Sequence, residues 1–292
     1  MSTNGRNGNR ILVVDDEASI VDAVATALRY EGFEVREEAT GRGAISAAYA
    51  GEVSIPVSDG HIPGYRAKPS GKNNLPVMLV VQEVFGIHEH IRDICRRFAH
   101  QGYYAIAPSL YARQGDPGKY DMDHLKELFT DVVSKVPDAE VMSDLDAAAA
   151  FASGDGGDAS RMGVIGFCWG GRIVWLYVAH NQKVRAGAAF YGALRGPYPA
   201  SPLRPKYPLD LVADINAPVL AFYGGQDKGI KAADIEEMRG ALHAAGKTSF
   251  RLELFPDAQH GFFADYRPSY NEKDAKEAWR ETLAWMKENG VA

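Results

Sequence analysis

The residues that point most directly to chemistry are Gly166-Phe167-Cys168-Trp169-Gly170, which fit the pattern G-x-S-x-G with cysteine in place of serine. The apolar segment Met162-Gly163-Val164-Ile165 precedes them, and a second apolar segment, Ile173-Val174-Trp175-Leu176, follows. This order predicts a strand, a tight turn and a helix. The flanking glycines suit a crowded turn that would not accept a Cβ atom. A thiol at the tip of such a turn predicts an activated cysteine nucleophile.

A thiol in neutral water is mostly protonated, so a cysteine nucleophile needs a nearby base and a group that orients the base. Asp227 follows the apolar run Ala217–Gly224, and His260 follows the run Ser249–Phe255. Nucleophile, acid and histidine in this order are typical of α/β hydrolases. Taken singly, His260 could be a loop histidine, Asp227 a helix-capping turn residue and Cys168 a buried structural thiol. Together they predict a catalytic triad.

Strand and helix patterns alternate from about residue 51 onward, which predicts an α/β-hydrolase fold with a mostly parallel central sheet and helices on both faces. The predicted strands are residues 76–82, 103–108, 162–166, 186–191, 217–224 and 249–255. The predicted helices are residues 87–101, 141–153, 170–180 and 272–289. The candidate nucleophile, acid and base all lie at or just after the carboxyl ends of predicted strands.

The composition fits an ordinary globular protein, with 292 residues of which 46% are hydrophobic. The net charge of −6 gives no indication of a nucleic-acid surface. No apolar run approaches the roughly 18 residues of a membrane helix. The two cysteines, Cys95 and Cys168, lie in different motifs, and the polar start MSTNGRNGNR has no signal-peptide pattern. We therefore expect a cytoplasmic protein without nucleic-acid or membrane partners.

Residues 10–50 have a separate β-α-β-α pattern. The strand Arg10–Val14 ends in Asp15-Asp16-Glu17, a helical pattern covers Ser19–Tyr30, a second strand covers Phe33–Arg36, and an alanine-rich helix is expected at Gly43–Ala50. This segment resembles the first half of a response-regulator receiver domain. The resemblance makes Asp15 and Asp16 weak candidates for a Mg²⁺ site, because paired carboxylates suit a hard cation.

Asp59 lies near the position where a receiver domain carries its phosphoacceptor aspartate. The segment Val57–Gly64 can be interpreted as the third receiver strand, but no second half of a receiver follows. Residues 52–57 and 64–67 also fit a β-hairpin around Asp59-Gly60, and we favour this interpretation. We therefore divide the chain into a truncated receiver-like fragment, residues 1–50, and a hydrolase domain, residues 51–292. The alternative is a signalling protein whose receiver segment regulates a hydrolase-fold output domain.

Residues 51–292 resemble the dienelactone hydrolase (carboxymethylenebutenolidase) family. The matching motifs are Gln82–Gly86, Leu110–Gly115, Gly166–Gly171 and Tyr223–Asp227, together with His260. The resemblance implies cleavage of small activated esters or lactones through a thioester intermediate, without a cofactor. It also implies roles for individual residues. Glu83 would contact the resting thiol and help to form the thiolate, and the backbone N–H groups of Val84 and Trp169 would form the oxyanion hole. Phe85 would line the pocket, and Arg113 would bind a substrate carboxylate.

One position departs from the family pattern. Well-known members have an arginine four residues after the catalytic histidine, where this chain has Ala264. A second carboxylate-binding arginine is therefore missing unless Arg267 takes its place. The structural alternatives are a strand-end carboxylate for Glu83 and a surface ion pair for Arg113. A non-catalytic binding module on the same scaffold would lack a member of the triad, and none is missing.

Overall fold

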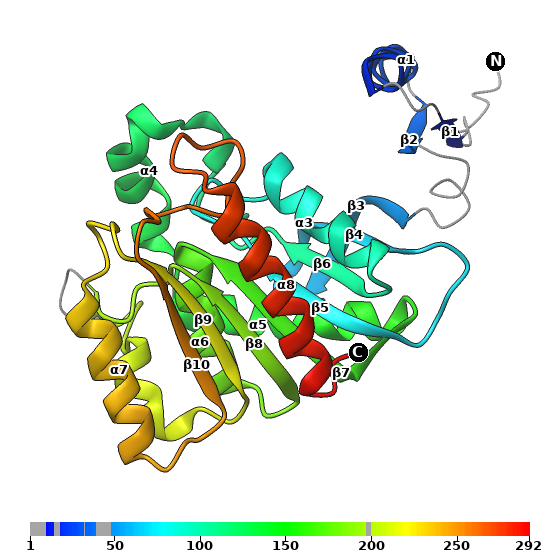
Figure 1. The fold of residues 1–292 in the computed structure, drawn as a ribbon. Helices are drawn as coiled ribbons and strands as arrows, with labels where there is room; N and C mark the ends of the chain where they lie inside the picture. Colours follow the sequence, from blue (N-terminus) through cyan, green and yellow to red (C-terminus); the bar gives the residue numbers. More distant parts are fainter. Residues whose placement is uncertain (1–9, 15–17, 32, 39–47, 197–199) are drawn as a thin grey trace.

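An eight-stranded sheet forms the centre of the molecule (Figure 1). The computed structural model describes residues 10–14, 18–31, 33–38, 48–196 and 200–292. The strand order is β10-β9-β8-β7-β5-β6-β4-β3. Strands β5 to β10 pair in parallel, whereas β4 is antiparallel to β6 and β3 is antiparallel to β4. The strands are β3 (Ala48–Val57), β4 (Gly60–Pro69), β5 (Leu75–Val81), β6 (Tyr104–Pro108), β7 (Gly157–Phe167), β8 (Val184–Phe190), β9 (Val219–Gly224) and β10 (Phe250–Phe255).

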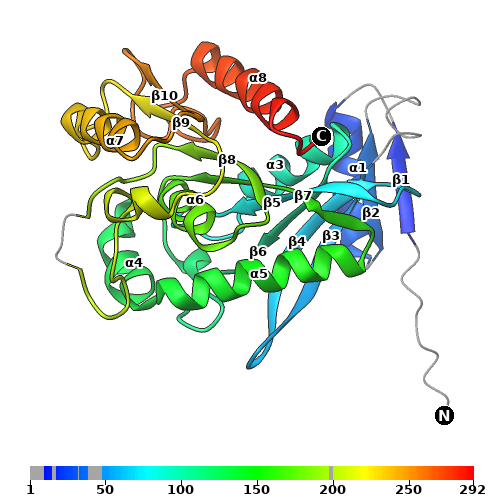
Figure 2. The same cartoon turned by 90° about the horizontal axis from the view of Figure 1, so that it is seen from below.

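The central strands read as continuous apolar runs because helices cover both faces of the sheet. Every residue of β5 and β6 is buried. Helices α3 (Glu89–His100) and α8 (Glu272–Glu288) lie on one face, and α5 (Asp138–Gly154) and α6 (Trp169–His180) lie on the other (Figure 2). This arrangement confirms the predicted α/β-hydrolase fold. The remaining helices are α4 (Leu125–Asp131), α7 (Ala232–Ala244) and the 3₁₀ helices η1 (Pro117–Lys119), η2 (Met122–His124), η3 (Val133–Lys135) and η4 (Pro208–Asp214).

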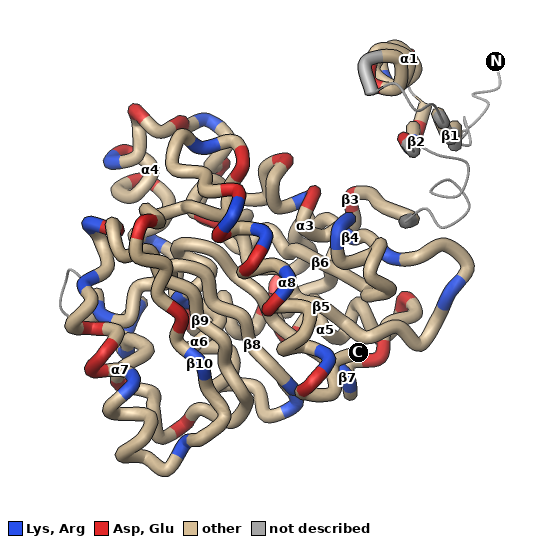
Figure 3. Tube along the Cα trace, viewed as in Figure 1, with Lys and Arg blue, Asp and Glu red and all other residues tan. Residues whose placement is uncertain are grey.

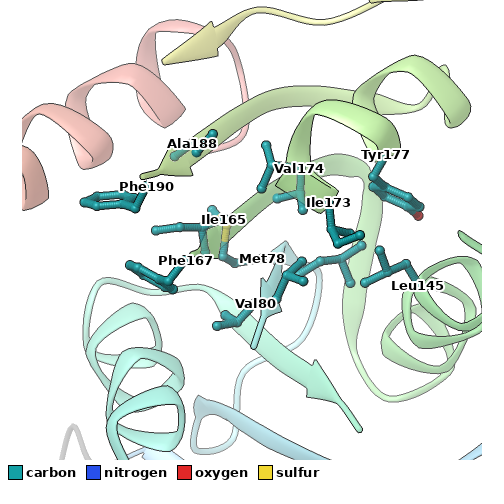
Figure 4. Packing of buried hydrophobic residues seen from close by; sticks show 14 of the residues in the cluster. Met78, Val80, Leu145, Ile165, Phe167, Ile173, Val174, Tyr177, Ala188 and Phe190 are labelled. Carbon is teal, nitrogen blue, oxygen red and sulfur yellow. The ribbon is translucent and has the colours of Figure 1, made fainter. Parts of the chain in front are cut away.

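The core packs around the nucleophile strand β7. Ile165 and Phe167 of β7 lie among Met78 and Val80 of β5, and all four are fully buried (Figure 4). Ile173 and Val174 of α6 and Leu145 of α5 are also buried and pack on the opposite face of β7. The outer helix α8 buries Ala275, Ala278, Trp285 and Met286 and exposes charges of both signs along its outer side (Figure 3). Tight packing on both faces holds the end of β7 in place.

The N-terminal segment forms a small β-α-β unit. Strands β1 (Arg10–Val14) and β2 (Glu34–Glu38) pair in parallel in a sheet of their own, with α1 (Ala18–Tyr30) between them in sequence. Arg36 Nη1 donates a hydrogen bond to Ser70 Oγ over 3.2 Å, on the β4 side of the large sheet. The first three predicted elements are thus confirmed. The predicted helix 43–50 is wrong at its end, because residues 48–50 belong to β3, and the rest of it lies outside the described residues. The candidate Mg²⁺ ligands Asp15 and Asp16 also lie outside the described residues.

The hairpin interpretation of the next segment is confirmed. Strands β3 and β4 pair antiparallel, with Val57 opposite Gly60, so Ser58 and Asp59 form the turn. Gly60 has φ of 141°, a conformation that side chains disfavour. Asp59 therefore lies in a turn between antiparallel strands and not at the end of a third receiver strand. Because β3 begins at Ala48, the proposed domain boundary at residue 50 falls inside this strand.

Candidate active site

Cys168 occupies a strained turn between β7 and α6. Its φ of 55° and ψ of −115° are rare for a residue with a side chain and cost about 1–3 kcal/mol. A Cβ atom on Gly166 would overlap the carbonyl group of Gly170, and a Cβ atom on Gly170 would come within 2.5 Å of the carbonyl oxygen of Gln82. The two flanking glycines allow β5, β7 and α6 to approach this closely. The turn places the thiol at the carboxyl edge of the sheet.

Asp227 and His260 are brought together from the ends of β9 and β10. His260 Nδ1 donates to Asp227 Oδ2 over 2.7 Å. The other carboxylate oxygen, Oδ1, accepts hydrogen bonds from the N–H groups of Gly229 at 2.7 Å and Ile230 at 3.2 Å. The Asp227 side chain is only 1% exposed. Burial would raise the pKa of Asp227, but these hydrogen bonds lower it, so the carboxylate is ionised and fixed in orientation.

His260 also interacts with the Cys168 thiol. Burial by itself would lower the pKa of His260, but attraction to a Cys168 thiolate and hydrogen bonds to Asp227 and Cys168 raise it to about 10. Because Asp227 takes Nδ1, Nε2 is the ring nitrogen left to face the sulfur. The three side chains predicted from separate motifs therefore meet in one place. A cysteine nucleophile needs a base within reach and a group that orients the base, and this arrangement meets both requirements.

Two backbone N–H groups beside the thiol are open to an incoming ligand. Trp169 is the first residue of α6, where N–H groups have no partner within the helix. Val84 lies in the turn Glu83–Gly86, which the N–H group of Gly86 closes by donating to the Glu83 carbonyl oxygen over 3.2 Å. Within the described residues, neither Val84 N–H nor Trp169 N–H donates a hydrogen bond to a protein atom. This arrangement suits the predicted oxyanion hole.

Glu83 is fully buried at the end of β5, with three partners that the sequence did not indicate. Tyr266 donates its hydroxyl to Oε2 over 2.6 Å, His88 Nε2 lies 3.3 Å from the same oxygen, and Arg267 Nη2 donates to Oε1 over 3.3 Å. Burial would raise the pKa of Glu83, but these partners lower it to about 2. Tyr266, His88 and Arg267 thus hold the carboxylate in place, and its contact with the resting thiol stays a prediction.

Arg267 lies beside the site, and Ala264 is buried. The Arg267 side chain is 9% exposed, and its guanidinium carbon lies 5.7 Å from the ring centre of Phe85 and 5.3 Å from that of Tyr266. Its charge interacts with Glu83 and with the Cys168 thiolate, which raise its pKa despite burial. The positive charge of Arg267 is balanced by Glu83, and the use of Arg267 in place of the missing second arginine stays a prediction.

Arg113, which we predicted to bind a substrate carboxylate, is paired with carboxylates of the protein itself. Arg113 Nε and Nη2 each donate to Asp59 over 2.7 Å, and Nη1 donates to Asp144 over 2.8 Å. Glu140 adds a third carboxylate at 3.6 Å. The Asp144 side chain is 1% exposed and needs a counter-charge, because an unpaired buried carboxylate is costly. The guanidinium is therefore occupied by the protein, as in the ion-pair alternative.

Sequence reasoning missed three aromatic residues of the site: His88, Tyr266 and Tyr191. Tyr191 follows β8 with φ of 38°, and its ring centre lies 5.0 Å from that of His260. Its hydroxyl is buried without a hydrogen-bond partner among the described residues. Tyr266 stands next to Arg267 in sequence, and His88 is five residues after Glu83. Their proximity to singled-out residues was the available signal.

Among the described residues, no group of three or more histidine, cysteine, aspartate or glutamate side chains is arranged to hold a metal ion. No helix in the same part of the chain combines the length and apolar character needed to cross a membrane.

Comparison with known proteins agrees with this geometry. The sequence profile of the dienelactone hydrolase family matches residues 62–290. A relative from Methylorubrum extorquens, named "Putative carboxymethylenebutenolidase", is 54% identical over 244 residues, which are 83% of this chain and 82% of the relative. A relative of the same name from Escherichia coli K12 is 49% identical over 84% of this chain and 89% of its own. A crystal structure from Klebsiella pneumoniae, described as a "Putative Dienelactone Hydrolase", superposes with a TM-score of 0.79 at 51% identity, covering 82% of this chain and 99% of that one.

The fold and these matches define an α/β hydrolase, and the protein is a hydrolytic enzyme. It belongs to the dienelactone hydrolase family. The family match begins at residue 62, so it lends no support to the receiver-like interpretation of residues 10–50 or to regulation through that segment.

Proposed function

We propose that this hydrolase cleaves small activated esters or lactones through a Cys168-His260-Asp227 triad and a thioester intermediate. The observation that carries the proposal is the position of Cys168: its thiol sits on a strained turn and interacts with an imidazole whose pKa is raised to about 10. A thiolate is the reactive form of cysteine, and His260 stabilises it. Asp227 holds the imidazole in one orientation.

The proposed reaction begins when the Cys168 thiolate attacks the substrate carbonyl carbon. The carbonyl oxygen becomes an oxyanion, which the N–H groups of Val84 and Trp169 stabilise. When the tetrahedral intermediate collapses, the C–O bond to the leaving group breaks and the leaving oxygen takes a proton from the His260 imidazolium. A water molecule then attacks the thioester, His260 accepts its proton, and the acid product leaves with restoration of the thiolate.

The choice of nucleophile limits the substrate. A thiolate leaves a tetrahedral intermediate more readily than an amine does, so an amide substrate would tend to revert. Enol esters, aryl esters and lactones have leaving groups good enough to compete. Activated esters and lactones are therefore the substrate class that fits a cysteine at this position.

Cys168→Ala is the direct test, with Cys95→Ala as the matched control. Cys95 is fully buried in α3, and its burial raises the pKa of the thiol, so this residue should remain unreactive. We expect Cys168→Ala to lose ester hydrolysis and labelling by iodoacetamide, measured by mass spectrometry, whereas Cys95→Ala keeps both. Full esterase activity in Cys168→Ala would refute the proposed nucleophile.

A further inference from the structure

A cavity of about 680 Å³ lies next to the Glu83–Arg267 ion pair. Its apolar lining consists of Phe85, Pro117, Tyr120, Met122 and Tyr266. We propose that this cavity binds an uncharged aromatic arm of the ester substrate and selects against a carboxylate on that arm. The inference rests on the proposed ester hydrolysis and names the substrate class that this site accepts.

The size and lining of the cavity fit an aryl group. Small-molecule sites have volumes of about 300–1,000 Å³ and mostly apolar walls with few polar groups. Three aromatic side chains, Phe85, Tyr120 and Tyr266, contribute to this wall. Aromatic rings favour edge-to-face or offset contacts with another ring. An aryl arm therefore binds this cavity more favourably than a short alkyl chain in the same position of the ester.

The charged groups around the cavity disfavour an anion. The carboxylates among its lining residues are Glu89, Asp93, Asp121 and Asp265. Arg96 also lines the cavity, but its guanidinium is bound to Glu89 and Asp93, and the neighbouring Arg97 pairs with Asp93 and Asp265. Two histidines also line the cavity: His88 Nε2 lies 3.3 Å from Glu83 Oε2, and burial lowers the pKa of His90, which favours its uncharged form. No cation of this wall is free to receive a substrate carboxylate.

The ion pair beside the cavity gives no free cation either. Arg267 contacts the rings of Phe85 and Tyr266 in the cavity wall, and its charge is paired with Glu83. Arg113 is bound by Asp59 and Asp144. A carboxylated substrate would have to break one of these pairs or enter an apolar cavity without a partner, and burying an unpaired carboxylate is expensive. A neutral arm pays neither penalty.

The test compares three para-substituted phenyl acetates that differ in charge. The substituents are methyl, carboxylate and trimethylammonium. We expect kcat/KM for the methyl compound to exceed that for the carboxylate by about tenfold or more at low salt, and the trimethylammonium compound to be hydrolysed at least as well as the carboxylate. Equal or faster hydrolysis of the carboxylate would overturn the inference while leaving the proposed ester hydrolysis intact.

Substitutions of residues that line the cavity test whether the cavity causes this selectivity. Asp121→Asn keeps a side-chain oxygen that can accept the N–H groups of Asp123 and His124, so it removes charge without removing the cap. It should raise kcat/KM for the carboxylate ester about two- to fivefold relative to kcat/KM for the methyl ester. The control is Glu237→Gln in α7, which removes an exposed ion pair with Arg195. This variant should change kcat/KM for neither the carboxylate ester nor the methyl ester. Tyr120→Ala should slow the aryl esters but not vinyl acetate, and Tyr120→Phe should restore them.

A binding measurement separates this inference from the catalytic proposal. ¹³C-methyl NMR of methionine in Cys168→Ala can follow Met122, assigned with Met122→Leu, during titration with acetanilide or 4-acetamidobenzoate. We expect acetanilide to shift the Met122 signal and 4-acetamidobenzoate to shift it at least tenfold less at equal concentration. Equal shifts would refute the selectivity. Selective binding by Cys168→Ala, combined with a wild-type protein that hydrolyses none of the esters, would instead refute the proposed function.

Discussion

The charged side chains of the site occur in fixed pairs. His260 is balanced by Cys168 and Asp227, Arg267 by Glu83, and Arg113 by Asp59 and Asp144. Pairing offsets the free energy of removing each charge from water. It also determines the protonation state of each group before substrate binds. The pH dependence of the enzyme should therefore report these pairs.

The first prediction concerns His260. Its folded-state pKa of about 10 lies above the ordinary value of 6.5, so its interactions stabilise the fold below pH 6.5 and are lost as the pH rises toward 10. The Cys168 thiolate is the largest influence that raises this pKa. In Cys168→Ala the imidazole should titrate at lower pH than in the wild type, measured by ¹⁵N NMR of the ring. Identical midpoints would show that no thiolate–imidazolium pair exists.

The second prediction concerns Glu83. Its pKa falls from 4.5 to about 2 in the folded protein, so its contribution is present above pH 4.5 and is lost as the pH falls toward 2. That shift corresponds to about 3 kcal/mol. Glu83→Gln should lower the free energy of unfolding at pH 7 by about 3 kcal/mol, because it leaves Arg267 buried without a counter-charge, and should flatten the pH dependence between 2 and 4.5. Urea denaturation measures both effects.

A matched control for Glu83→Gln is Glu253→Gln, which breaks an exposed ion pair with Arg251. The Glu253 side chain is 40% exposed. Such pairs contribute about 0–1 kcal/mol, so this variant should unfold almost like the wild type. A similar loss in both variants would indicate a general effect of charge removal and not the buried pair.

Functional residues could be predicted from the sequence where they belong to a short motif. The partners of their hydrogen bonds and ion pairs could not. Cys168, Asp227 and His260 each follow a buried strand, and their positions were recognisable from this context. The partners of Arg113 lie 54 and 31 residues away in a hairpin turn and a helix. Only the fold brings these carboxylates to the guanidinium, so the sequence suggested a free arginine where the structure has an occupied one.

At the level of elements, the turn between β7 and α6 determines the site. It requires close approach of three segments, and Gly166 and Gly170 lie where they meet. Strand positions were well predicted because β5, β6, β9 and the second half of β7 are buried apolar runs, whereas β10 alternates apolar and charged residues. Helix α7 was not predicted: it has Gly240 in its interior and few buried residues, namely Ile235, Met238 and Leu242, so its apolar period is weak.

The third prediction compares two glycine substitutions in different elements. Gly166→Ala should lower the free energy of unfolding by more than about 2 kcal/mol and slow alkylation of Cys168, since its Cβ atom would overlap the Gly170 carbonyl. Gly240→Ala in α7 should raise stability by about 0.5–1 kcal/mol, because no atom lies within 4 Å of its Cβ position and alanine favours helix. Urea denaturation of both variants is the measurement. Equal effects would contradict the crowding argument.

At the scale of the whole molecule, one sheet supports every part of the site. Glu83 follows β5, Cys168 follows β7, Tyr191 follows β8, Asp227 follows β9 and His260 follows β10. The carboxyl ends of parallel strands share one edge, where such sheets bind ligands. The N-terminal β1–β2 unit has a separate sheet and contributes no strand to this edge. The division into two domains stays a prediction; strand β3, which pairs within the large sheet, begins at Ala48.

The fourth prediction follows from that division. A chain that begins at Ala48 retains all eight strands of the large sheet. We expect kcat/KM for aryl esters within about twofold of the full chain, and a free energy of unfolding within about 1 kcal/mol, since the removed unit lies outside the catalytic sheet. Kinetics and urea denaturation check both. A large loss of activity would indicate that residues 1–47 take part in forming the site.

The order of the strands also determines when the thiol becomes reactive during synthesis. Chains emerge from their N-terminus, and Cys168 leaves the ribosome well before β9, Asp227, β10 and His260. Until those elements pair with β8, no imidazolium stabilises the thiolate, and an ordinary thiol reacts slowly at neutral pH. Under the proposed mechanism, the growing chain therefore carries its nucleophile in an inactive state, and completion of the sheet activates it.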